Sequence, residues 1–351
     1  MDRKRIGGWI AMILAAGSFW AAPASGEKAA PGTFHEDGPV TVRLFSENDA
    51  PFYQIGRRSD RYYTNGAAIA VAWSPTWADD LAERLPFAGW FGEPDRTAFG
   101  VTAGQLIFTP EDLESRQLIP EDRPYAGYLY AGAYLQRMRN DVMDHFQLDV
   151  GVIGDSSFAQ DMQEWVHDIL ADIDPNGWDN QLSDELTVQF TYRRKWRLAV
   201  GRFDLFEMPI EVEAIPDVVG RVGLVHRDLG GGGTLRFGRR LPDDFGPARL
   251  SDVNAAPGDY PLGLSAYGFI RVGGRVVEHN VFLEGSNFDD SHGVPIHALV
   301  GEAQVGVAAS YTWSGSQLQL GWSQTFRTKE FEGQEGIHAF GAWTVSFHCW
   351  Y

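Results

Sequence analysis

One stretch of the chain combines an amphipathic helix pattern with a histidine that could act as a general base. Residues 158–178 read FAQDMQEWVHDILADIDPNGW. Gln163 and His167 are four residues apart and therefore share one helix face. Neutral imidazole can accept a proton near physiological pH, and a nearby carboxylate such as Asp172 or Asp174 could orient its ring. The alternative is a surface helix with a solvated histidine. The apolar side chains of this stretch form a separate helical stripe at Phe158, Met162, Trp165, Val166, Ile169, Leu170 and Ile173.

Two short polar motifs precede this helix. Ser46-Glu47-Asn48-Asp49 ends a strand-like segment with three consecutive carboxylate or amide side chains. Such oxygen atoms suit a hard cation such as calcium, although an acidic turn is commonly just solvated. The segment 62–66, YYTNG, contains Thr64, which could bind substrate or orient a catalytic group. Its alternative role is an Asn-Gly turn that opens a strand.

A third motif, 121–127, reads EDRPYAG. Its Asp122-Arg123 pair fits either a structural ion pair or a phosphate contact. The chain has no G-x-S-x-G nucleophile elbow, no H-E-x-x-H zinc motif and only one cysteine, Cys349. The glycine run 230–233 lacks the Lys-Ser/Thr of a phosphate loop, so we expect a bend or bulge inside a strand.

Strands must position these residues, because period-two alternation recurs along the chain. Apolar side chains alternate with Gln, Thr, Ser, Arg and Gly in twelve to fourteen segments. Asn140-Asp141 and Gly273-Gly274 are expected turns between them. The clearest segments are 40–47, 67–73, 145–152, 186–193, 304–313, 317–323 and 343–351, with further candidates at 99–108, 125–137, 264–273 and 275–284.

Two all-β architectures fit this pattern: a soluble sandwich or propeller, and a closed antiparallel transmembrane β-barrel. The persistently polar alternate face favours the barrel, whose outer face meets lipid. The chain also ends within a strand, on the aromatic Tyr351. Closure would pair every backbone group inside the membrane. Aromatic residues at strand ends fit interfacial girdles, namely Trp73, Tyr125, Tyr128, Tyr130, Trp313 and Trp350.

Charge and the N-terminus narrow the class of protein further. Three basic residues, then an uncharged segment and Ala22-Pro23-Ala24, predict a secretory signal peptide over 1–24 and a mature barrel over 25–351. The formal charge of −18 argues against a nucleic-acid partner. A single cysteine excludes an intramolecular disulfide framework, and no later apolar run could form a transmembrane helix.

Taken together, the motifs resemble those of the outer-membrane lipid A 3′-O-deacylase family over nearly the whole mature chain. The joint order and spacing carry the resemblance, since no single motif is specific. The matching residues are Asn48-Asp49, Tyr63-Thr64-x-Gly66, Asp122-Arg123-Pro124, Gly151-Val152-Ile153-Gly154 and Gln163-x-x-x-His167, followed by Pro175, Trp178 and Gln181.

The resemblance implies a barrel of about twelve strands in the outer membrane of a Gram-negative bacterium, with one helix in an extracellular loop. It implies calcium-dependent removal of the 3′-linked acyloxyacyl chain of lipid A, the membrane anchor of lipopolysaccharide. His167 would be the general base on a water. Asn48 and Asp49 match the calcium and catalytic centre, Thr64 and Gln163 match supporting positions, and Asp172 matches a family Glu as a further metal ligand.

One segment departs from the family. Where some members carry a Lys-Arg pair upstream of Asp-Arg-Pro, this chain has Leu113-Glu114-Ser115-Arg116, which puts a lipid A phosphate contact in doubt. Two alternatives to the deacylase are a non-catalytic barrel or pore and an outer-membrane phospholipase-type esterase. Beyond outer-membrane lipid and the lipopolysaccharide substrate we expect no partner, and a monomer.

Overall fold

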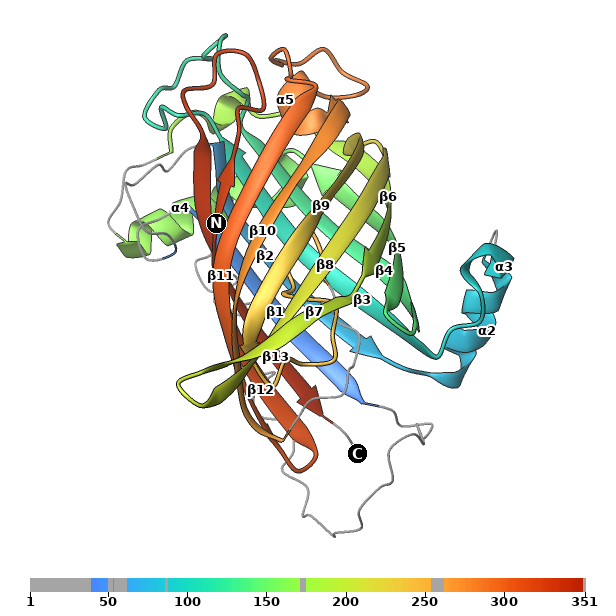
Figure 1. The fold of residues 1–351 in the computed structure, drawn as a ribbon. Coiled ribbons are helices and arrows are strands. Elements are labelled where there is room, and N and C mark those ends of the chain that lie inside the picture. Colours follow the sequence, from blue (N-terminus) through green and yellow to red (C-terminus); the bar gives the residue numbers. More distant parts are fainter. Residues whose placement is uncertain are drawn as a thin grey trace. The chain divides into compact units, whose positions relative to one another are not determined.

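The computed structural model describes residues 39–49, 53, 62–85, 88–170, 175–253 and 262–349, which all belong to one unit, 36–351. Its strands form a single antiparallel sheet that closes into a barrel (Figure 1). In chain order they are β1 Val40–Asn48, β2 Tyr62–Trp73, β3 Arg96–Thr109, β4 Ala126–Arg139, β5 Val142–Ile153, β6 Glu185–Trp196, β7 Leu198–Leu205, β8 Met208–Gly223, β9 His226–Arg239, β10 Gly263–Asn280, β11 Leu299–Trp313, β12 Ser316–Arg327 and β13 His338–Cys349.

The barrel has twelve strands in its ring, because β7 continues β6. Both pair with β8 in one register, with Lys195 opposite Asp217 and Leu198 opposite Ala214. β5 ends its pairing with β6 at Trp196, so the β7–β8 hairpin protrudes past the neighbouring strands (Figure 1). The first strand, β1, pairs with the last, β13, and β6 pairs with β8, so the sheet forms an unbroken ring. The sequence prediction of about twelve strands is confirmed.

Four helices accompany the described strands: α2 Thr76–Arg84, α3 Ala88–Phe91, α4 Ala159–Leu170 and α5 Val281–Glu284. The helical stretch predicted from 158 onward is α4, and the other three were not predicted. No helix in the described ranges is long and apolar enough to cross a membrane. Three of the five connections at one barrel end are two-residue turns, at Asn140-Asp141, Phe206-Glu207 and Ser314-Gly315, whereas at the other end the β8–β9 connection, Leu224-Val225, is the single one of that length. Outer-membrane barrels keep such short turns on the periplasmic side, so the opposite end, with α4, is extracellular.

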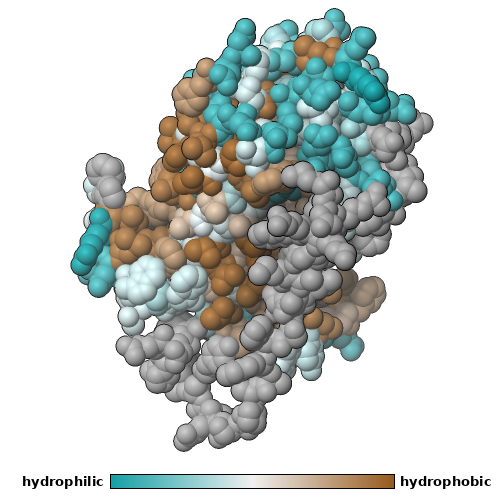
Figure 2. All heavy atoms as spheres, turned by 180° about the vertical axis from the view of Figure 1, so that it is seen from behind, coloured by the Kyte–Doolittle hydropathy of each residue, from teal (hydrophilic) through white to brown (hydrophobic). Residues whose placement is uncertain are grey.

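The outer face of the barrel is apolar, as the alternation predicted. Leu148, Val150, Leu186, Val188 and Val307 are all about half exposed or more. Figure 2 shows apolar side chains spreading over the sheet below a polar end of the molecule. Lipid contact explains this arrangement, because apolar exposure on that scale would be unfavourable in water.

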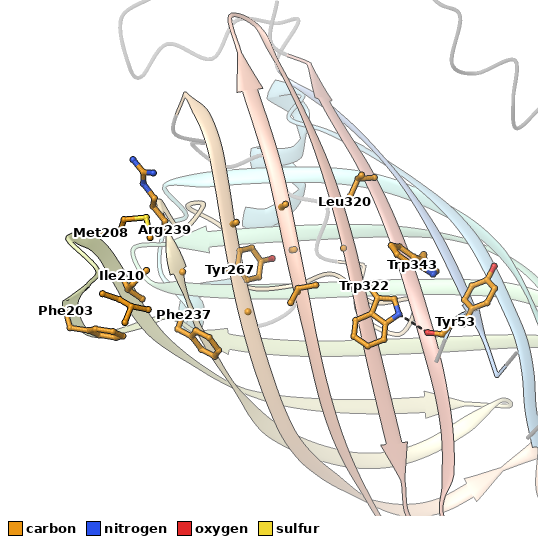
Figure 3. Close-up of a pocket in the computed structure, with 18 residues that line it drawn as sticks. Tyr53, Phe203, Met208, Ile210, Phe237, Arg239, Tyr267, Leu320, Trp322 and Trp343 are labelled. Atoms are coloured by element: carbon orange, nitrogen blue, oxygen red, sulfur yellow. Dashed lines mark hydrogen bonds between the residues drawn. The ribbon is translucent and has the colours of Figure 1, made fainter. Parts of the chain in front are cut away.

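A broad groove also lies on this outer face (Figure 3). The β7–β8 hairpin borders it through Phe203 and Met208, and Trp322 and Trp343 flank its other side. Trp322 Nε1 donates a hydrogen bond to the Tyr53 carbonyl at 2.8 Å. Among the described residues, none of the predicted site residues lines this groove.

Two predictions about individual residues are wrong, one about three girdle tyrosines and one about a glycine turn. Tyr128 and Tyr130 are buried inside the barrel and join its inner aromatic cluster, and Tyr125 is buried under the loop beyond α4. They are therefore not girdle residues. Gly273-Gly274 does not make a turn, because β10 runs through it without a break. These glycines pair with Gly232 and Gly231 of β9, in a stretch without a bulge.

A segment between β9 and β10 fills the half of the lumen that lies away from the extracellular end. Within it, Lys195 Nζ contacts the Asp252 carboxylate at 2.7 Å and the Phe245 carbonyl at 3.1 Å. Arg43 donates to the Val253 carbonyl at 3.0 Å. The core of the barrel in this half is thus polar and charged, and the buried Lys195 is paired with the buried Asp252 carboxylate.

Candidate active site on the outer wall of the barrel

Four outward-facing positions form a row across the first four strands near the extracellular rim. Asn48 of β1 pairs with Asn65 of β2, Asn65 with Ile107 of β3, and Ile107 with Gly127 of β4. Neighbouring strands lie about 4.8 Å apart, so this row spans about 14 Å of wall. The polar motifs of β1 and β2 occupy one end of this row, and the helix packs on the β3–β4 end.

α4 begins on this row. The backbone of Gly127 lies against Ser157 and Ala159, so closely that a Cβ there would sit 2.3 Å from the Ala159 Cβ. Ile107 packs with Ala159 and Met162 in one buried cluster. Gln105, also facing outward on β3, donates to the Ser157 carbonyl at 2.7 Å. The helix therefore lies outside the barrel wall, transverse to the strands (Figure 1).

The wall-facing side of α4 carries the two predicted site residues. Ala159, Gln163 and His167 are all buried, at 1%, 3% and 7% exposure. They recur every four residues, so each lies about 6 Å beyond the last along the helix axis. Asp161, Glu164 and Asp168 on the other faces are exposed. The alternative of a solvated surface histidine is therefore wrong.

The apolar stripe predicted for this helix is not its most buried face. Phe158 is 61% exposed, and its left-handed backbone, with φ 57°, separates the preceding turn from α4. Trp165 and Val166 are half-buried. Periodicity identified the helix correctly but not its contact face, because in a membrane protein apolar side chains also face lipid.

Gln163 anchors α4 to the loop that follows it. Its Oε1 accepts a hydrogen bond from Trp178 Nε1 at 2.9 Å. Trp178 is buried against Tyr125, with ring centroids 4.9 Å apart. The loop is tied to β4 in turn, because Leu182 N donates to the Tyr125 carbonyl. Sequence reasoning missed Tyr125 and Trp178 as supports of the helix, although a tryptophan N–H close to a predicted site needs an acceptor when buried.

Thr64 also faces the outer wall. The β2–β3 register shifts between Tyr63 and Asn65, so Thr64 is the extra residue of a bulge. Its hydroxyl exchanges a 2.7 Å hydrogen bond with that of Thr109 on β3, two residues beyond Ile107. A β-bulge changes the direction of a side chain, and here it places the Thr64 hydroxyl beside the outward-facing row of Asn48, Asn65, Ile107 and Gly127. Thr109 is a residue that the sequence did not single out.

The first polar motif divides between the two sides of the wall. Asn48 faces outward, half-buried, at the end of β1, and Asp49 follows it fully buried. Glu47 faces the lumen, where it accepts hydrogen bonds from Tyr63 OH at 2.8 Å and Leu250 N at 3.3 Å. Glu47 therefore lies on the other side of the wall from Asn48, and the three adjacent side chains of this motif cannot all bind one cation.

The donor set at the outer wall fits calcium chemically. Asn48, Asp49 and Thr64 supply amide, carboxylate and hydroxyl oxygens, with no sulfur or imidazole, as a hard cation prefers. Among the described residues, no three or more His, Cys, Asp or Glu gather as a ready-made metal cluster. Asp172, the further predicted ligand, lies outside the described residues.

The segment where the family's basic pair was expected lies directly beside this site. Leu113 is buried with Ile107 and Trp178, whereas Glu114 and Arg116 are exposed. Asn180 Nδ2 donates to the Arg116 carbonyl at 3.1 Å. Arg116 is thus placed next to the loop that supports α4. Arg123 of the third motif instead enters the lumen and lies over the Phe108 ring.

Comparisons with known proteins agree with this architecture. A family model described as "Outer membrane protein LpxR" matches residues 9–349. The solved structure of LpxR from Salmonella typhimurium superposes with a TM-score of 0.68 at 19% identity, covering 88% of this chain and 99% of that one. The β domain of the Bordetella autotransporter BrkA reaches a TM-score of 0.42 at 13% identity, covering 90% and 100%. No curated protein sequence matches the chain.

Proposed function

This chain belongs to the LpxR family of outer-membrane proteins, and from that membership we propose that it removes the 3′-linked acyloxyacyl chain of lipid A by hydrolysing its ester bond. The observation that carries the proposal is the placement of His167. It is buried at 7% exposure and shares a helix face with Gln163 and with Ala159, which packs on Ile107 of the outer wall near the extracellular rim. Lipid A lies in the outer leaflet on that side of the membrane, so its ester can approach the site from the bilayer.

His167 is the proposed general base. Its neutral imidazole accepts a proton from water while the water oxygen attacks the ester carbonyl carbon. The tetrahedral intermediate then expels the sugar 3′-oxygen, which takes up a proton. The products are the free acyloxyacyl acid and a 3′-hydroxyl on the glucosamine. Burial excludes bulk water from this base, so a water bound beside the substrate is favoured as nucleophile.

Gln163 and Thr64 are proposed to position the reacting groups. Gln163 fixes α4 through its bond to Trp178, one helical turn before His167. Thr64 is held by Thr109 on the neighbouring strand β3. Asn48 and Asp49, with Asp172, would hold a calcium ion that supplies positive charge for the developing oxyanion when it is bound. Each of these roles follows from residue chemistry and from the family pattern.

Neither alternative function gains support from the described residues. A phospholipase-type esterase would use a serine beside the base, and Ser157, the buried serine next to α4, instead donates to the Gly154 carbonyl at 2.6 Å. A pore would need a continuous lumen. The segment that contains Phe245, Asp252 and Val253 crosses the lumen, and it is bonded to the wall on several sides.

The test is mass spectrometry of lipid A after incubation with the purified protein in detergent, with calcium or with a calcium chelator. We expect the wild type to remove one acyloxyacyl mass only with calcium. His167→Ala should lower the rate at least a hundredfold, as loss of a general base does. Asp161→Ala, on the exposed side of the same helix, is the control and should keep full activity.

Three outcomes would count against the proposal. Unchanged lipid A with folded wild-type protein would exclude the substrate. Full activity in chelator would exclude calcium. Equal rates for His167→Ala and wild type would exclude the base.

A further inference from the structure

A polar cavity of about 170 Å³ lies in the lumen, on the other side of the wall from the candidate active site. Its lining includes Glu47, Tyr63 and Phe108, whose chain neighbours Asn48, Thr64 and Thr109 belong to the outer site. The volume is enough for about five water molecules, or for one small polyatomic ion with part of its hydration shell.

The cavity is rich in arginine within a strongly acidic protein. Seven arginines line it, against four carboxylates. The arginines are Arg123, Arg193, Arg221, Arg249, Arg271, Arg275 and Arg327, and the carboxylates are Glu47, Asp228, Glu302 and Glu330.

The carboxylates near the cavity are already engaged. Glu302 pairs with Arg249 and Arg327, at 2.7 and 3.0 Å. Glu330 pairs with Arg275 at 2.7 Å, and Asp228 pairs with Arg221. A fifth carboxylate, Asp217, serves both Arg193 and Arg271. The guanidinium groups still outnumber these carboxylates by two.

Arg123 is the cavity arginine for which the described residues provide no carboxylate partner. Its residue is 2% exposed, yet among the described residues it forms no salt bridge. One nitrogen donates to the Phe282 carbonyl at a long 3.3 Å, and the group lies 4.6 Å over the Phe108 ring. Its Nε is buried and has no acceptor within the described part of the chain. A guanidinium offers five N–H donors, so most of them remain available.

The carboxylate of the neighbouring Asp122 is engaged by backbone groups. The Asp122 carboxylate accepts hydrogen bonds from the backbone N–H groups of Arg123 and Glu111, at 2.7 and 2.8 Å. Burial lowers the pKa of the Arg123 guanidinium to about 10, against the opposing effect of Glu330. A buried cation in this state gains from a counter-charge, because desolvation without one is costly.

We propose that this lumenal cavity binds a free phosphate-sized oxyanion, with Arg123 as its principal ligand. A tetrahedral oxyanion offers pairs of oxygen atoms that match the planar fork of a guanidinium. The anion would come from solution, because the cavity lies inside the ring of strands while lipid headgroups lie outside it. This site is separate from the outer-wall site and does not depend on the proposed deacylase activity.

The glycine run 230–233 has a clear role in this proposal. Inward-facing Gly232 lies against Arg271, so that a Cβ there would come within 2.9 Å of the Arg271 Nη2 and 2.6 Å of the Val272 carbonyl. Gly230 and Gly273, which face inward like Gly232, line the cavity. Side chains at these two positions would occupy part of its space, so the inward-facing glycines of β9 and β10 leave room for the arginines and for an ion.

The test is calorimetric titration of the full-length protein in detergent with inorganic phosphate, at an ionic strength held constant with sodium chloride. We expect saturable binding by the wild type and a matching rise in its thermal unfolding midpoint. Arg123→Gln should weaken binding at least tenfold. Arg202→Gln, at an exposed position of β7, is the matched control and should bind like the wild type.

A second variant keeps the test informative if Arg123→Gln does not fold. Gln304 lines the same cavity, and Gln304→Glu adds a carboxylate there. We expect that variant to lose the phosphate response and to unfold at a higher temperature than wild type in phosphate-free buffer. No saturable response in the wild type, or an equal response in folded Arg123→Gln, would overturn the proposal. Binding of phosphatidic acid in mixed micelles but not of inorganic phosphate would overturn the free anion as its ligand.

Discussion

Gln163 and His167 share one face of α4, and a hydrogen bond to the following loop defines the role of Gln163. Its side-chain oxygen is the acceptor for the buried Trp178 indole at 2.9 Å. Trp178 packs on Tyr125, and Tyr125 is joined by backbone pairing to the loop that ends at β6. Gln163 therefore supports the site by holding the helix, and we treat it as a positioning residue.

A double-mutant cycle tests that role. Gln163→Leu and Trp178→Phe each remove the same hydrogen bond, so each should lower deacylation about tenfold. The double variant should be no slower than the worse single variant, because residues that share one interaction are not additive. The measurement is the initial rate of acyl-chain release from lipid A in detergent. If the rate losses of the two single variants multiplied in the double variant, or if Trp178→Phe were fully active, the hydrogen bond would not position the helix.

At the scale of elements, the site depends on where α4 meets the wall. The contact is possible because β4 presents Gly127 to the start of the helix, where Ser157 and Ala159 come too close for a side chain. The strands determine one surface, through the Asn48–Asn65–Ile107–Gly127 row, and the loop between β5 and β6 provides the other. Relative movement of the two would shift the α4 face that carries Gln163 and His167 relative to this row.

Gly127→Ala should displace α4 without opening the barrel. The added Cβ would meet the Ala159 Cβ at 2.3 Å, so the helix must move outward by more than an ångström. Misplacement of that size costs on the order of a hundredfold in rate. We expect activity to fall 10- to 100-fold, while heat-modifiable gel mobility still reports a folded barrel.

Gly201→Ala is the matched control for this change. A Cβ at Gly201 would have no atom within 4 Å, so activity and folding should both be unchanged. Wild-type activity in Gly127→Ala would mean that the contact between α4 and β4 does not set the geometry of the site.

At the scale of the whole molecule, the barrel is held by charges inside and apolar side chains outside. Arg193, Lys195 and Asp252 join the wall to the segment that crosses the lumen. Near the extracellular end, Glu330 joins the loop after β12 to Arg275 and Arg327. Because these pairs are buried, loss of one partner leaves an uncompensated charge, which is strongly destabilising.

Acid should weaken this extracellular network through Glu330. Burial alone would raise the pKa of its carboxyl, but Arg327, Arg275 and Arg123 together hold that pKa at about 2. Because the folded-state pKa lies below the unfolded-state pKa of about 4.3, the ionised Glu330 carboxylate stabilises the fold at pH values above 4.3. That stability is lost as the pH falls toward 2. The contribution at neutral pH is on the order of 3 kcal/mol.

The measurement is the urea unfolding midpoint in detergent between pH 7 and pH 2. Glu330→Gln should unfold more readily at pH 7 and show a smaller further loss in acid. Glu332→Gln, exposed two residues away, is the control and should follow the wild-type curve. If Glu330→Gln had the wild-type pH dependence, Glu330 would not be the group responsible.

The sequence by itself determined the barrel. Its two-residue alternation matches the side-chain repeat of a β-strand, and contact with lipid favours apolar side chains on one face of the sheet. It also determined the helix, the Gln163–His167 spacing and the polar motifs, since these are local features. It could not determine that Tyr128 and Tyr130 face inward, or that β10 continues through Gly273-Gly274, because both depend on pairing with distant strands.

Only the tertiary structure decided which motif residues act on the same side of the wall. The bulge in β2 places the Thr64 side chain outside the barrel. The alternation of β1 places Asn48 outside and Glu47 in the lumen. α4 then buries Gln163 and His167 on that outer surface, while Arg123 enters the interior cavity. A one-residue change of register reverses the side on which a side chain lies, and register is set by partners far away in the chain.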